Sequence, residues 1–438
     1  MPMPVAPRQF QDLPVSGDEM HALAARLYPI CRSITGDGVR QSLRELQHYA
    51  DIVVHEVPTG SAILDWTVPP EWSLREAHIT NSRGQRIVDL ADHALHVVSY
   101  STPVRAQLTL SQLRPHLHSL PEQPDLIPYR TSYFVANWGF CLPHQVLETL
   151  PEDRYTVVID SALTAGSLTY GEYLHRGDTD SEVLLSAHIC HPSLANDNCS
   201  GLAVLALLAQ QLKAIRTRYS YRFLFAPGTI GAITWLARNR EHVARIKHGL
   251  VVSNVGDGGG PTYKRSRQGS AAIDRAASHV LGRSSLPAQL VDFTPYGYDE
   301  RQYCSPGFDL PVGSFQRSVW GQFPEYHTSA DNLAFIRPEH LATSFRLICG
   351  ILDVLEGNVM LRNTCPFGEP QLGRRGIYDA IDGRRPTETE RMAMLWVLNL
   401  ADGRNDLLAI ADRAHLDFAA VRTAATRLSA AGLLEAVT

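Results

Sequence analysis

A short polar stretch between an apolar strand and an apolar helix constrains the fold of this chain more than any other feature. Residues 182–185 are typical of a buried strand, and residues 202–212 form an apolar run long enough for a helix. Between them lie Ser-Ala-His-Ile-Cys-His-Pro, residues 186–192, and Asn-Asp-Asn-Cys-Ser-Gly, residues 196–201. Open α/β sheets bind ligands outside the carboxyl ends of their strands. The sequence therefore predicts a functional site at this strand end.

The residue types in this stretch favour a metal site. Neutral imidazoles and carboxylates are ligands that suit zinc and its neighbours among the transition metals, and His188, His191 and Asp197 supply both kinds. In the alternative interpretation the stretch is a polar loop, an Asp or Asn caps the helix, and both histidines are satisfied within the protein. The stretch alone leaves both interpretations open.

Strands and helices alternate along most of the chain. Short helices are expected at 18–27 and 38–50, before the first strands. Further along, apolar strands are predicted at 155–159, 182–185, 220–225 and 248–253, and helices near 199–216, 230–246, 271–282 and 337–356. This alternation is typical of an α/β fold with a mostly parallel sheet covered by helices.

Changes in the length and residue pattern of the predicted elements divide the chain into domains. Between 55 and 135, short alternating segments are broken by Gly, Pro and Asn, which predicts a small inserted all-β domain of the β-sandwich kind. The α/β domain then comprises residues 15–54 and 136–380. A stretch rich in Gly, Pro and Arg at 358–385 is predicted to be a linker. Three short helices in 386–438 resemble a winged helix-turn-helix.

Composition and charge limit the partners. The net charge of −5 gives no electrostatic footprint for nucleic acid or an anionic membrane, and no apolar run approaches the roughly 20 residues of a transmembrane helix. In the tail, five arginines meet seven acidic residues, a net charge of −2, which favours packing or dimerisation over DNA binding. The start of the chain lacks the apolar core of a signal peptide, and the seven cysteines are scattered. A cytoplasmic location is therefore expected.

Four segments, taken in order, resemble the co-catalytic zinc aminopeptidase superfamily and, more closely, a bacterial aminopeptidase-like branch of it. His188 matches the histidine that ends a strand, and Asp197 matches the bridging carboxylate. Asp257, in Asn-Val-Gly-Asp, and His327, in Glu-Tyr-His-Thr, match the later ligands. The resemblance implies that these four residues bind one or two zinc ions, with His191 as a reserve ligand, in a zinc-exopeptidase-like α/β domain.

The resemblance fails after the strand at 220–225. Peptidases of the superfamily have Glu-Glu there, as general base and second-zinc ligand, and the closer branch resembles Pro-Glu-Thr-Ile-Gly. This chain has Gly228 and Thr229 instead. Glycine cannot accept a proton, and general acid–base help is typically worth about 10²–10⁴-fold. In addition, Cys190 stands where the superfamily has an Asp that orients the first histidine.

Glu325 is the candidate replacement for the catalytic base. It precedes His327 by two residues, so on an extended segment both side chains would point to the same face. The alternatives are a solvated carboxylate, or a partner that holds His327 in one tautomer.

Five residues are predicted to bind substrate. Asp299 and Glu300 belong to Tyr-Gly-Tyr-Asp-Glu-Arg, which resembles a pocket motif of the aminopeptidase-like branch, although such a cluster is usually a surface ion-pair group. Arg317 is able to form bidentate hydrogen bonds with a substrate carboxylate. Arg32 lies in a turn that resembles part of the active-site wall, or else a helix cap, and Tyr326 adjoins His327.

Three functions follow from these residues. The first is a zinc-dependent, aminopeptidase-like hydrolase that acts on an amide bond of a small-molecule or peptide substrate. The second is a single-zinc acyl-transfer or cyclase-type enzyme, because glutaminyl cyclases of the same superfamily use such a scaffold. The third is a non-catalytic metal-binding interaction protein. A homo-oligomer is compatible with all three.

Overall fold

The computed structural model describes residues 9–377 and 387–437, which fall into two compact units. The first unit comprises Leu13–Ala271 and Leu286–Arg346. The second comprises Gln9–Asp12, Ala272–Ser285 and the described part of Leu347–Thr438. The long helix α9 (Pro338–Gly357) runs from the first unit into the second.

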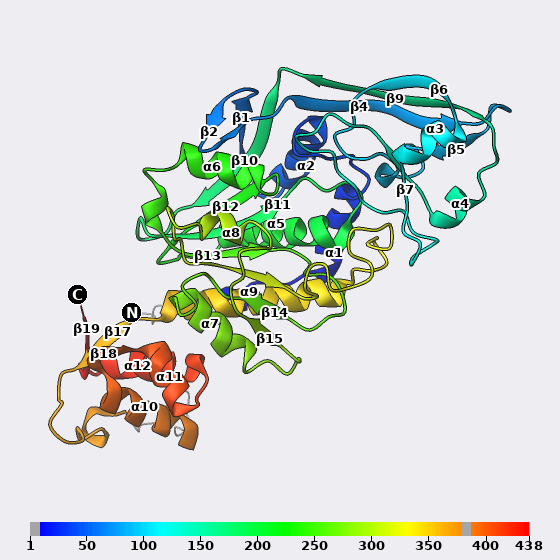
Figure 1. Ribbon diagram of the computed structural model, residues 1–438. Coiled ribbons are helices and arrows are strands. Elements are labelled where there is room, and N and C mark those ends of the chain that lie inside the picture. Colours follow the sequence, from blue (N-terminus) through cyan, green and yellow to red (C-terminus); the bar gives the residue numbers. More distant parts are fainter. Residues whose placement is uncertain (1–8, 378–386, 438) are drawn as a thin grey trace. The chain divides into compact units, whose positions relative to one another are not determined.

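The first unit is built on an eight-stranded sheet whose central strands are parallel (Figure 1). Parallel ladders join β12 to β11, β11 to β13 and β13 to β16, whereas β1, β10 and β14 pair antiparallel. In spatial order the strands are β1 (Val53–Pro58), β10 (Ser167–His175), β12 (Ser220–Ala226), β11 (Glu182–His188), β13 (Ile246–Val252), β16 (Val312–Gln316), β14 (Thr262–Lys264) and β15 (Gln289–Val291). The predicted α/β fold with a mostly parallel sheet is therefore confirmed.

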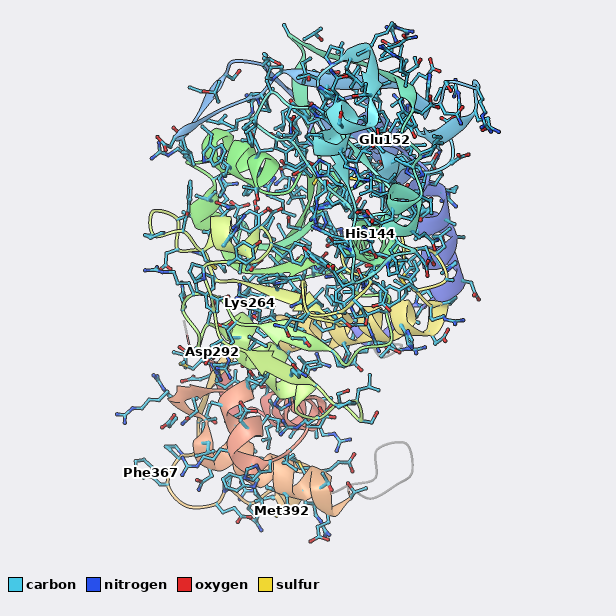
Figure 2. The ribbon with its side chains drawn as sticks, turned by 45° about the vertical axis from the view of Figure 1, so that its right-hand side comes forward. His144, Glu152, Lys264, Asp292, Phe367 and Met392 are labelled. Carbon is cyan, nitrogen blue, oxygen red and sulfur yellow. The ribbon has the colours of Figure 1, made fainter. Side chains whose placement is uncertain are left out.

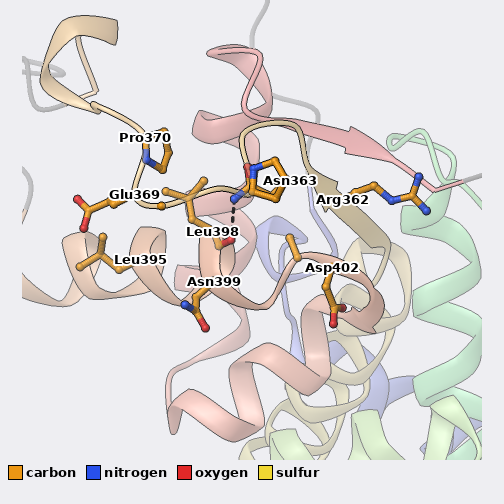
Figure 3. Close-up of a pocket in the computed structure, with 11 residues that line it drawn as sticks. Arg362, Asn363, Glu369, Pro370, Leu395, Leu398, Asn399 and Asp402 are labelled. Carbon is orange, nitrogen blue, oxygen red and sulfur yellow. Dashed lines mark hydrogen bonds between the residues drawn. The ribbon is translucent and has the colours of Figure 1, made fainter.

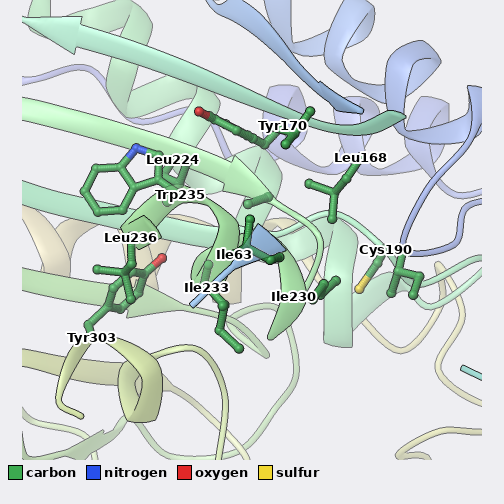
Figure 4. Close-up of a cluster of buried hydrophobic side chains, with 14 of the residues drawn as sticks. Ile63, Leu168, Tyr170, Cys190, Leu224, Ile230, Ile233, Trp235, Leu236 and Tyr303 are labelled. Carbon is green, nitrogen blue, oxygen red and sulfur yellow. The ribbon is translucent and has the colours of Figure 1, made fainter. Parts of the chain in front are cut away.

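Helices cover the sheet on both faces. On one face, α6 (Ile230–Arg238) and α8 (Glu300–Tyr303) form an apolar cluster with the strands, in which Trp235 and Tyr303 are fully buried and Cys190 lies at the margin (Figure 4). Helix α5 (Gly201–Leu212) contacts β10, β11, β12 and β13. Successive residues of β11 point to opposite faces of the sheet, and all of them are buried, so both faces are covered. Helix α5 covers the face opposite to α6 and α8.

Two helices begin the first unit. The segments predicted at 18–27 and 38–50 form α1 (Gly17–Leu27) and α2 (Asp37–Gln47). Ser16 caps α1 by accepting a hydrogen bond from the backbone N–H of Glu19. Helix α1 packs against α5 and against the turn that precedes α5, so the helix supports the loop after β11.

The predicted insert differs from the expectation in its boundary and its architecture. Its four-stranded antiparallel sheet has the order β5 (Arg86–Asp89), β4 (Glu71–Thr80), β9 (Arg154–Thr164), β6 (Val104–Thr109). The strand predicted at 155–159 for the α/β domain is β9, at the centre of this sheet, because an apolar strand has the same pattern in either sheet. The hairpin β2 (Ala62–Ile63) and β3 (Trp66–Thr67) precedes β4.

One four-stranded sheet with two small two-stranded sheets, β2–β3 and β7–β8, and not a sandwich of two large sheets, forms this part of the chain. The residues that pack on the four-stranded sheet lie on short helices and two-residue strands, and Leu110, Leu113 and Leu147 contribute to the same apolar cluster as Tyr155. These elements are α3 (Leu110–Leu113), α4 (His144–Glu148), β7 (Leu117–His118) and β8 (Phe140–Cys141).

The second unit contains a three-stranded antiparallel sheet and four complete helices in its described residues. Its sheet order is β18 (Asp402–Asp406), β17 (Met360–Asn363), β19 (Leu434–Ala436), and its helices are α7 (Ala272–Leu281), α10 (Glu388–Leu400), α11 (Leu407–Ala414) and α12 (Phe418–Ala430). The three predicted tail helices are present. The predicted linker at 358–385 contains β17, a short strand that gains its partners only from the tail, and residues 378–385 lie outside the described residues.

Charged side chains fasten α7 to the winged helix within the second unit. Arg275 donates two hydrogen bonds to Asp406, at 2.7 and 2.8 Å, and His279 Nδ1 lies 2.6 Å from Asp412 Oδ1. Apolar side chains also reach the surface of this unit, where Phe367 is fully exposed (Figure 2). Among the described residues, no helix combines the length and the apolar character that a bilayer span needs.

Candidate metal centre

The loop after β11 brings three predicted ligands together. β11 ends at His188, and the chain then passes through a single π-helical turn, η4 (Ala195–Ser200), into α5. The ligand atoms of His188, His191 and Asp197 all lie within 4.8 Å of one another. The Nε2 atoms of His188 and His191 are 3.8 and 3.9 Å from the Asp197 carboxylate. His191, a reserve ligand in the sequence-based prediction, is therefore a full member of the group.

His327 approaches the same carboxylate from a distant loop. Its Nε2 atom lies 2.8 Å from Oδ2 of Asp197. The backbone at His327 has a φ of +57°, and its carbonyl accepts a hydrogen bond from the Tyr129 N–H at 2.7 Å. The ring of Tyr326 stacks on the imidazole at a centroid distance of 3.9 Å. This backbone and these rings hold His327 against Asp197.

The segment before His327 forms turns, so the geometric argument for Glu325 was wrong. Tyr326 N–H donates to the Phe323 carbonyl, and Thr328 N–H to the Glu325 carbonyl. An extended strand would have placed Glu325 and His327 on one face, whereas in this turn it is Tyr326 that contacts the imidazole. Glu325 is partly exposed, and its catalytic role stays a prediction.

Several polar atoms of this group lack an ordinary hydrogen-bond partner among the described residues. Both nitrogens of His188 are buried without a partner, and Nε2 of His327 and Oδ2 of Asp197 are buried and contact only each other, at 2.8 Å. Burial of polar atoms without partners costs free energy. Burial also lowers the pKa of His188 and, more strongly, of His191, so both imidazoles are neutral near pH 7 and present lone pairs.

These residues fit a zinc ion. Zinc is bound in proteins by neutral histidine nitrogens and carboxylate oxygens, with four ligands in closed sites. His188, His191 and Asp197 bring two imidazoles and one carboxylate within 4.8 Å of one another, and His327 adds a third imidazole 2.8 Å from the same carboxylate. A metal ion bound by these residues would supply the contacts that both nitrogens of His188 lack.

Asp331 holds the turn that carries Asp197 in place through hydrogen bonds to its backbone. Its carboxylate accepts hydrogen bonds from the backbone N–H groups of Asn196, at 2.6 Å, and Asp197, at 2.9 Å. Its carbonyl accepts a third from Ala195 at 3.0 Å. Burial raises the pKa of Asp331 to about 8. No role was predicted for Asp331 from the sequence, although an Asp four residues after a candidate ligand was a usable signal.

Arg32 supports the same loop. It is fully buried, and its guanidinium donates to the His191 carbonyl, the Asn198 side chain, the Leu27 carbonyl and Ser42. All of these acceptors belong to the protein. The contacts of Arg32 therefore support a positioning role, because each nitrogen of its buried guanidinium already donates to an acceptor of the protein. Its contact with substrate stays a prediction.

Asp257 is not brought into the ligand group. Its Oδ1 accepts hydrogen bonds from Gly259 N–H and Ser318 Oγ, both at 2.6 Å, and its Oδ2 accepts from the Asn196 side chain at 2.7 Å. Both oxygens are thus occupied. Asp257 holds Asn196, the neighbour of Asp197, in place.

Tyr298 and Asn254 are the site residues that sequence reasoning missed. The Tyr298 hydroxyl donates to Oδ1 of Asp197 and accepts a 2.8 Å hydrogen bond from the Asn254 side chain. The Tyr298 ring also stacks on His188 at a centroid distance of 5.1 Å. Asn254 follows β13, the strand next to β11, so its position at the end of a neighbouring parallel strand was the available signal.

The end of β12 is closed by the protein's own groups. Gly228 N–H donates to Sγ of Cys190 at 3.2 Å, and Thr229 N–H donates to Oδ1 of Asp299 at 2.6 Å. Arg301 donates to the Thr229 hydroxyl at 3.1 Å. Burial raises the pKa of Asp299 to about 7 and that of Cys190 to about 12.

The backbone at this strand end is strained. Thr229 has φ +62° and ψ −73°, and the Ile230 N–H donates to the Gly228 carbonyl at 2.8 Å, so these residues form a γ-turn of the rare kind. Such strain is often found at functional sites. The atoms nearest to a Cβ built on Gly228 would be Cys190 Sγ, at 3.5 Å, and His188 Cβ, at 3.7 Å. A Cβ at 228 would therefore fit in ordinary van der Waals contact beside Cys190 and His188.

Two other predicted substrate residues are deeply buried and differ in their partners. Glu300 is fully buried and pairs with Lys264 at 2.8 Å, which leaves its predicted contact with substrate without an exposed surface. Arg317 is 4% exposed, and its Nε and Nη1 atoms have no hydrogen-bond partner among the described residues.

A hollow in the second unit has a different chemistry. It has a volume of about 680 Å³ and is lined by residues such as Asn363 and Asp402 (Figure 3). Asn363 donates to the Leu398 carbonyl, and Asp402 accepts from the Arg404 N–H. These polar groups are satisfied within the protein, in contrast to those of the histidine group.

Comparison with families agrees with the two structural parts. A family model described as a domain of unknown function, DUF4910, matches residues 21–358, and a winged helix-turn-helix model matches residues 359–436. The second match begins at β17, as the sheet of the second unit does.

Relatives and solved structures connect the chain to aminopeptidase-like proteins. A Clostridium acetobutylicum protein provisionally named for polysaccharide biosynthesis, with an aminopeptidase-like domain, is 46% identical over 430 residues, which are 98% of this chain and 99% of that protein. A crystal structure of a C. acetobutylicum protein provisionally named a peptidase has a TM-score of 0.92 at 45% identity, over 96% of each chain. A zinc aminopeptidase of Bacillus subtilis has a TM-score of 0.57 at 15% identity, over 78% of this chain and 95% of that one, and shares the fold.

Proposed function

Since the chain belongs to the DUF4910 family and has an aminopeptidase-like fold, we propose that it is a zinc-dependent hydrolase of an amide bond in a small amino-acid-derived substrate. One observation carries the proposal. The buried imidazole of His188, the partly buried imidazole of His191 and the buried carboxylate of Asp197 converge at the end of a central parallel strand, and both nitrogens of His188 have no hydrogen-bond partner among the described residues.

His188, His191, His327 and Asp197 would hold the zinc ion. When bound there, zinc would lower the pKa of a water molecule and polarise the amide carbonyl. Tyr298 holds Asp197 through its hydroxyl, and Asp331 holds the backbone of the same turn. These contacts fix the ligands before metal or substrate arrives, which is the role of partners behind the ligands in metal sites.

The source of the catalytic base separates this chain from ordinary aminopeptidases. Gly228 has no side chain to accept a proton. Glu325, on the loop of His327, remains the candidate base, and Asp299 at the end of β12 is a second carboxyl near the missing position. We expect slow amide hydrolysis, because general acid–base catalysis supplies about 10²–10⁴-fold.

The winged helix serves as a packing element and not as a nucleic-acid reader in this proposal. On α12, Arg422 donates to the Asp353 carbonyl and to the side chain of Gln9, and Arg427 lies near Glu390. The exposed side chains of this helix are uncharged: Ala419, Thr423, Thr426, Ser429 and Ala430. A phosphate backbone needs a positive surface, and α12 does not supply one.

Zinc content and amide hydrolysis, measured together on the full chain, test the proposal. Wild type is compared with His188→Ala and with His144→Ala, a control in α4, which packs on the four-stranded antiparallel sheet. The substrates are aminoacyl anilides and, because one relative is named for polysaccharide biosynthesis, acetamido sugars. We expect about one zinc per chain in wild type and in the control, none in His188→Ala, and hydrolysis only where zinc is bound.

Other outcomes would point to the other functions. Zinc without hydrolysis, but with transfer to an added amine, would support an acyl-transfer enzyme. Absence of zinc from the wild type would refute both catalytic functions and leave an interaction protein.

A further inference from the structure

An unpaired, buried guanidinium lies at the end of β16. Arg317 is 4% exposed, its Nε and Nη1 atoms are buried without partners, and burial lowers the pKa of the guanidinium. The neighbouring carboxylate of Asp257 already accepts hydrogen bonds from Ser318, Gly259 and Asn196 on both oxygens. The charge of Asp257 acts on the guanidinium, but Nε and Nη1 of Arg317 still lack hydrogen bonds. A buried charge with unsatisfied donors is unfavourable, so the protein retains Arg317 at a cost that an anionic ligand would reduce.

The position of Arg317 connects it to the metal ligands through three contacts. Its backbone N–H donates to the Asn254 carbonyl at 2.7 Å, which continues the β13–β16 ladder beyond the strands. The Asn254 side chain donates to Tyr298, and Tyr298 donates to Asp197. The Oδ1 atom of Asn254 is also buried without a partner. Unpartnered donors and an unpartnered acceptor therefore occupy the same strand ends.

We propose that Arg317 binds a carboxylate of the substrate, so that the hydrolysed amide belongs to a dipeptide or an N-acyl amino acid. β11, β13 and β16 are successive neighbours about 4.8 Å apart, which places the ends of β11 and β16 about 10 Å from each other. One residue between the amide and the carboxylate spans about 3.5 Å, and the long arginine side chain covers the remainder. The inference rests on the proposed function of the same site.

Calorimetric titration of the full chain with alanyl-alanine and with its C-terminal amide tests this inference. Chelator-treated protein is used, so that binding is measured without turnover. We expect wild type to bind the acid about 10- to 100-fold more tightly than the amide, because hydrogen bonds to charged groups have this worth. Arg317→Met should lose the preference, and Arg317→Lys should keep part of it, since lysine retains the charge but not the two-pronged geometry.

Thermal melting and zinc content complete the test. Arg317→Met should melt at or above the temperature of wild type, because it removes an unpaired buried charge. Equal binding of acid and amide by wild type, an undiminished preference in Arg317→Met, or a melting point several degrees lower in that variant would each overturn the inference. If the protein binds no zinc but prefers the acid through Arg317, the inference is upheld and the proposed hydrolase is refuted. If the protein binds zinc and hydrolyses amides but shows no preference that depends on Arg317, the inference alone is refuted.

Discussion

The ends of two neighbouring strands, β11 and β12, differ in whether their polar groups have hydrogen-bond partners within the protein. At the end of β11, His188 is buried with both ring nitrogens unpartnered, beside His191 and Asp197. At the end of β12, the N–H groups of Gly228 and Thr229 are bound by Cys190 and Asp299. The first end is kept open for a ligand, and the second is closed by the protein.

The two strand ends show that the group of residues able to hold a metal and the position of the catalytic base are separate parts of this fold. A strand end that needs a metal keeps costly unpartnered atoms. The end of β12 has no catalytic carboxylate, so its backbone N–H groups need not be left for a ligand, and hydrogen bonds within the protein stabilise them. The chain therefore combines a ligand group that fits zinc with a base position that holds no side chain.

The largest expected effect comes from the open end. Asp197→Asn keeps the shape of the side chain but removes the charge that His188, His191 and His327 surround. We expect zinc affinity to fall by more than about 100-fold, beyond the usual effect of residues behind the ligands. Competition titration with a zinc chelator measures it, with Asp178→Asn, which pairs with Arg216 at the surface, as control. An unchanged affinity would show that Asp197 is not a ligand.

A carboxylate introduced at residue 228, after the end of β12, should have the next largest effect, on the rate of amide hydrolysis. A Cβ at 228 fits beside Cys190 and His188, so Gly228→Glu should raise amide hydrolysis by about 10²–10⁴-fold. Gly228→Gln has the same shape and cannot act as a base, so it should remain at the wild-type rate. Steady-state rates of the zinc-loaded proteins decide the matter. Equal rates for the two variants would mean that another group already supplies the base.

Asp331 links the open end to the loop beneath it, and its replacement should have a moderate effect. Asp331→Ala removes the acceptors of the Asn196 and Asp197 N–H groups and should weaken zinc binding by about 10- to 100-fold. Asp292→Ala, at an exposed carboxylate that lies 3.6 Å from Arg265, is the control. A change in folding stability without a change in zinc affinity would show that Asp331 supports the fold and not the site.

The sequence predicts the parts of this comparison that depend on local pattern. Apolar periodicity identified β11, β12, β13 and the helices between them, and the missing glutamate at 228 was visible directly. Periodicity does not tell which sheet a strand joins, so β9 was assigned to the wrong sheet, and β17 was hidden in a Gly- and Pro-rich stretch because its partners are far away in the chain.

Side-chain direction after a strand end was not predictable from spacing. His191 and Asp257 both follow strands closely, yet the loop turns the first into the ligand group, and hydrogen bonds hold the second outside it. Arg32 was correctly linked to the site region, but its complete burial arises from tertiary packing. Tyr298 reaches Asp197 across 101 residues of sequence, which no local pattern contains.

The smallest expected effect concerns the pH dependence of stability at the closed end. Burial raises the pKa of Asp299 to about 7, above its usual value of 3.8, so the folded protein holds a proton there that the unfolded chain releases. Stability from this group is present below pH 3.8 and is lost as pH rises toward 7, with a slope of at most about 1.4 kcal/mol per pH unit. Asp299→Asn mimics the protonated acid and should make the slope less steep than that of wild type in denaturant unfolding between pH 4 and 7, while Asp331, whose pKa burial also raises, keeps its own share of the slope. If the variant had the same slope as wild type, Asp299 would be ionised in the folded state, and the end of β12 would carry a carboxylate able to accept a proton after all.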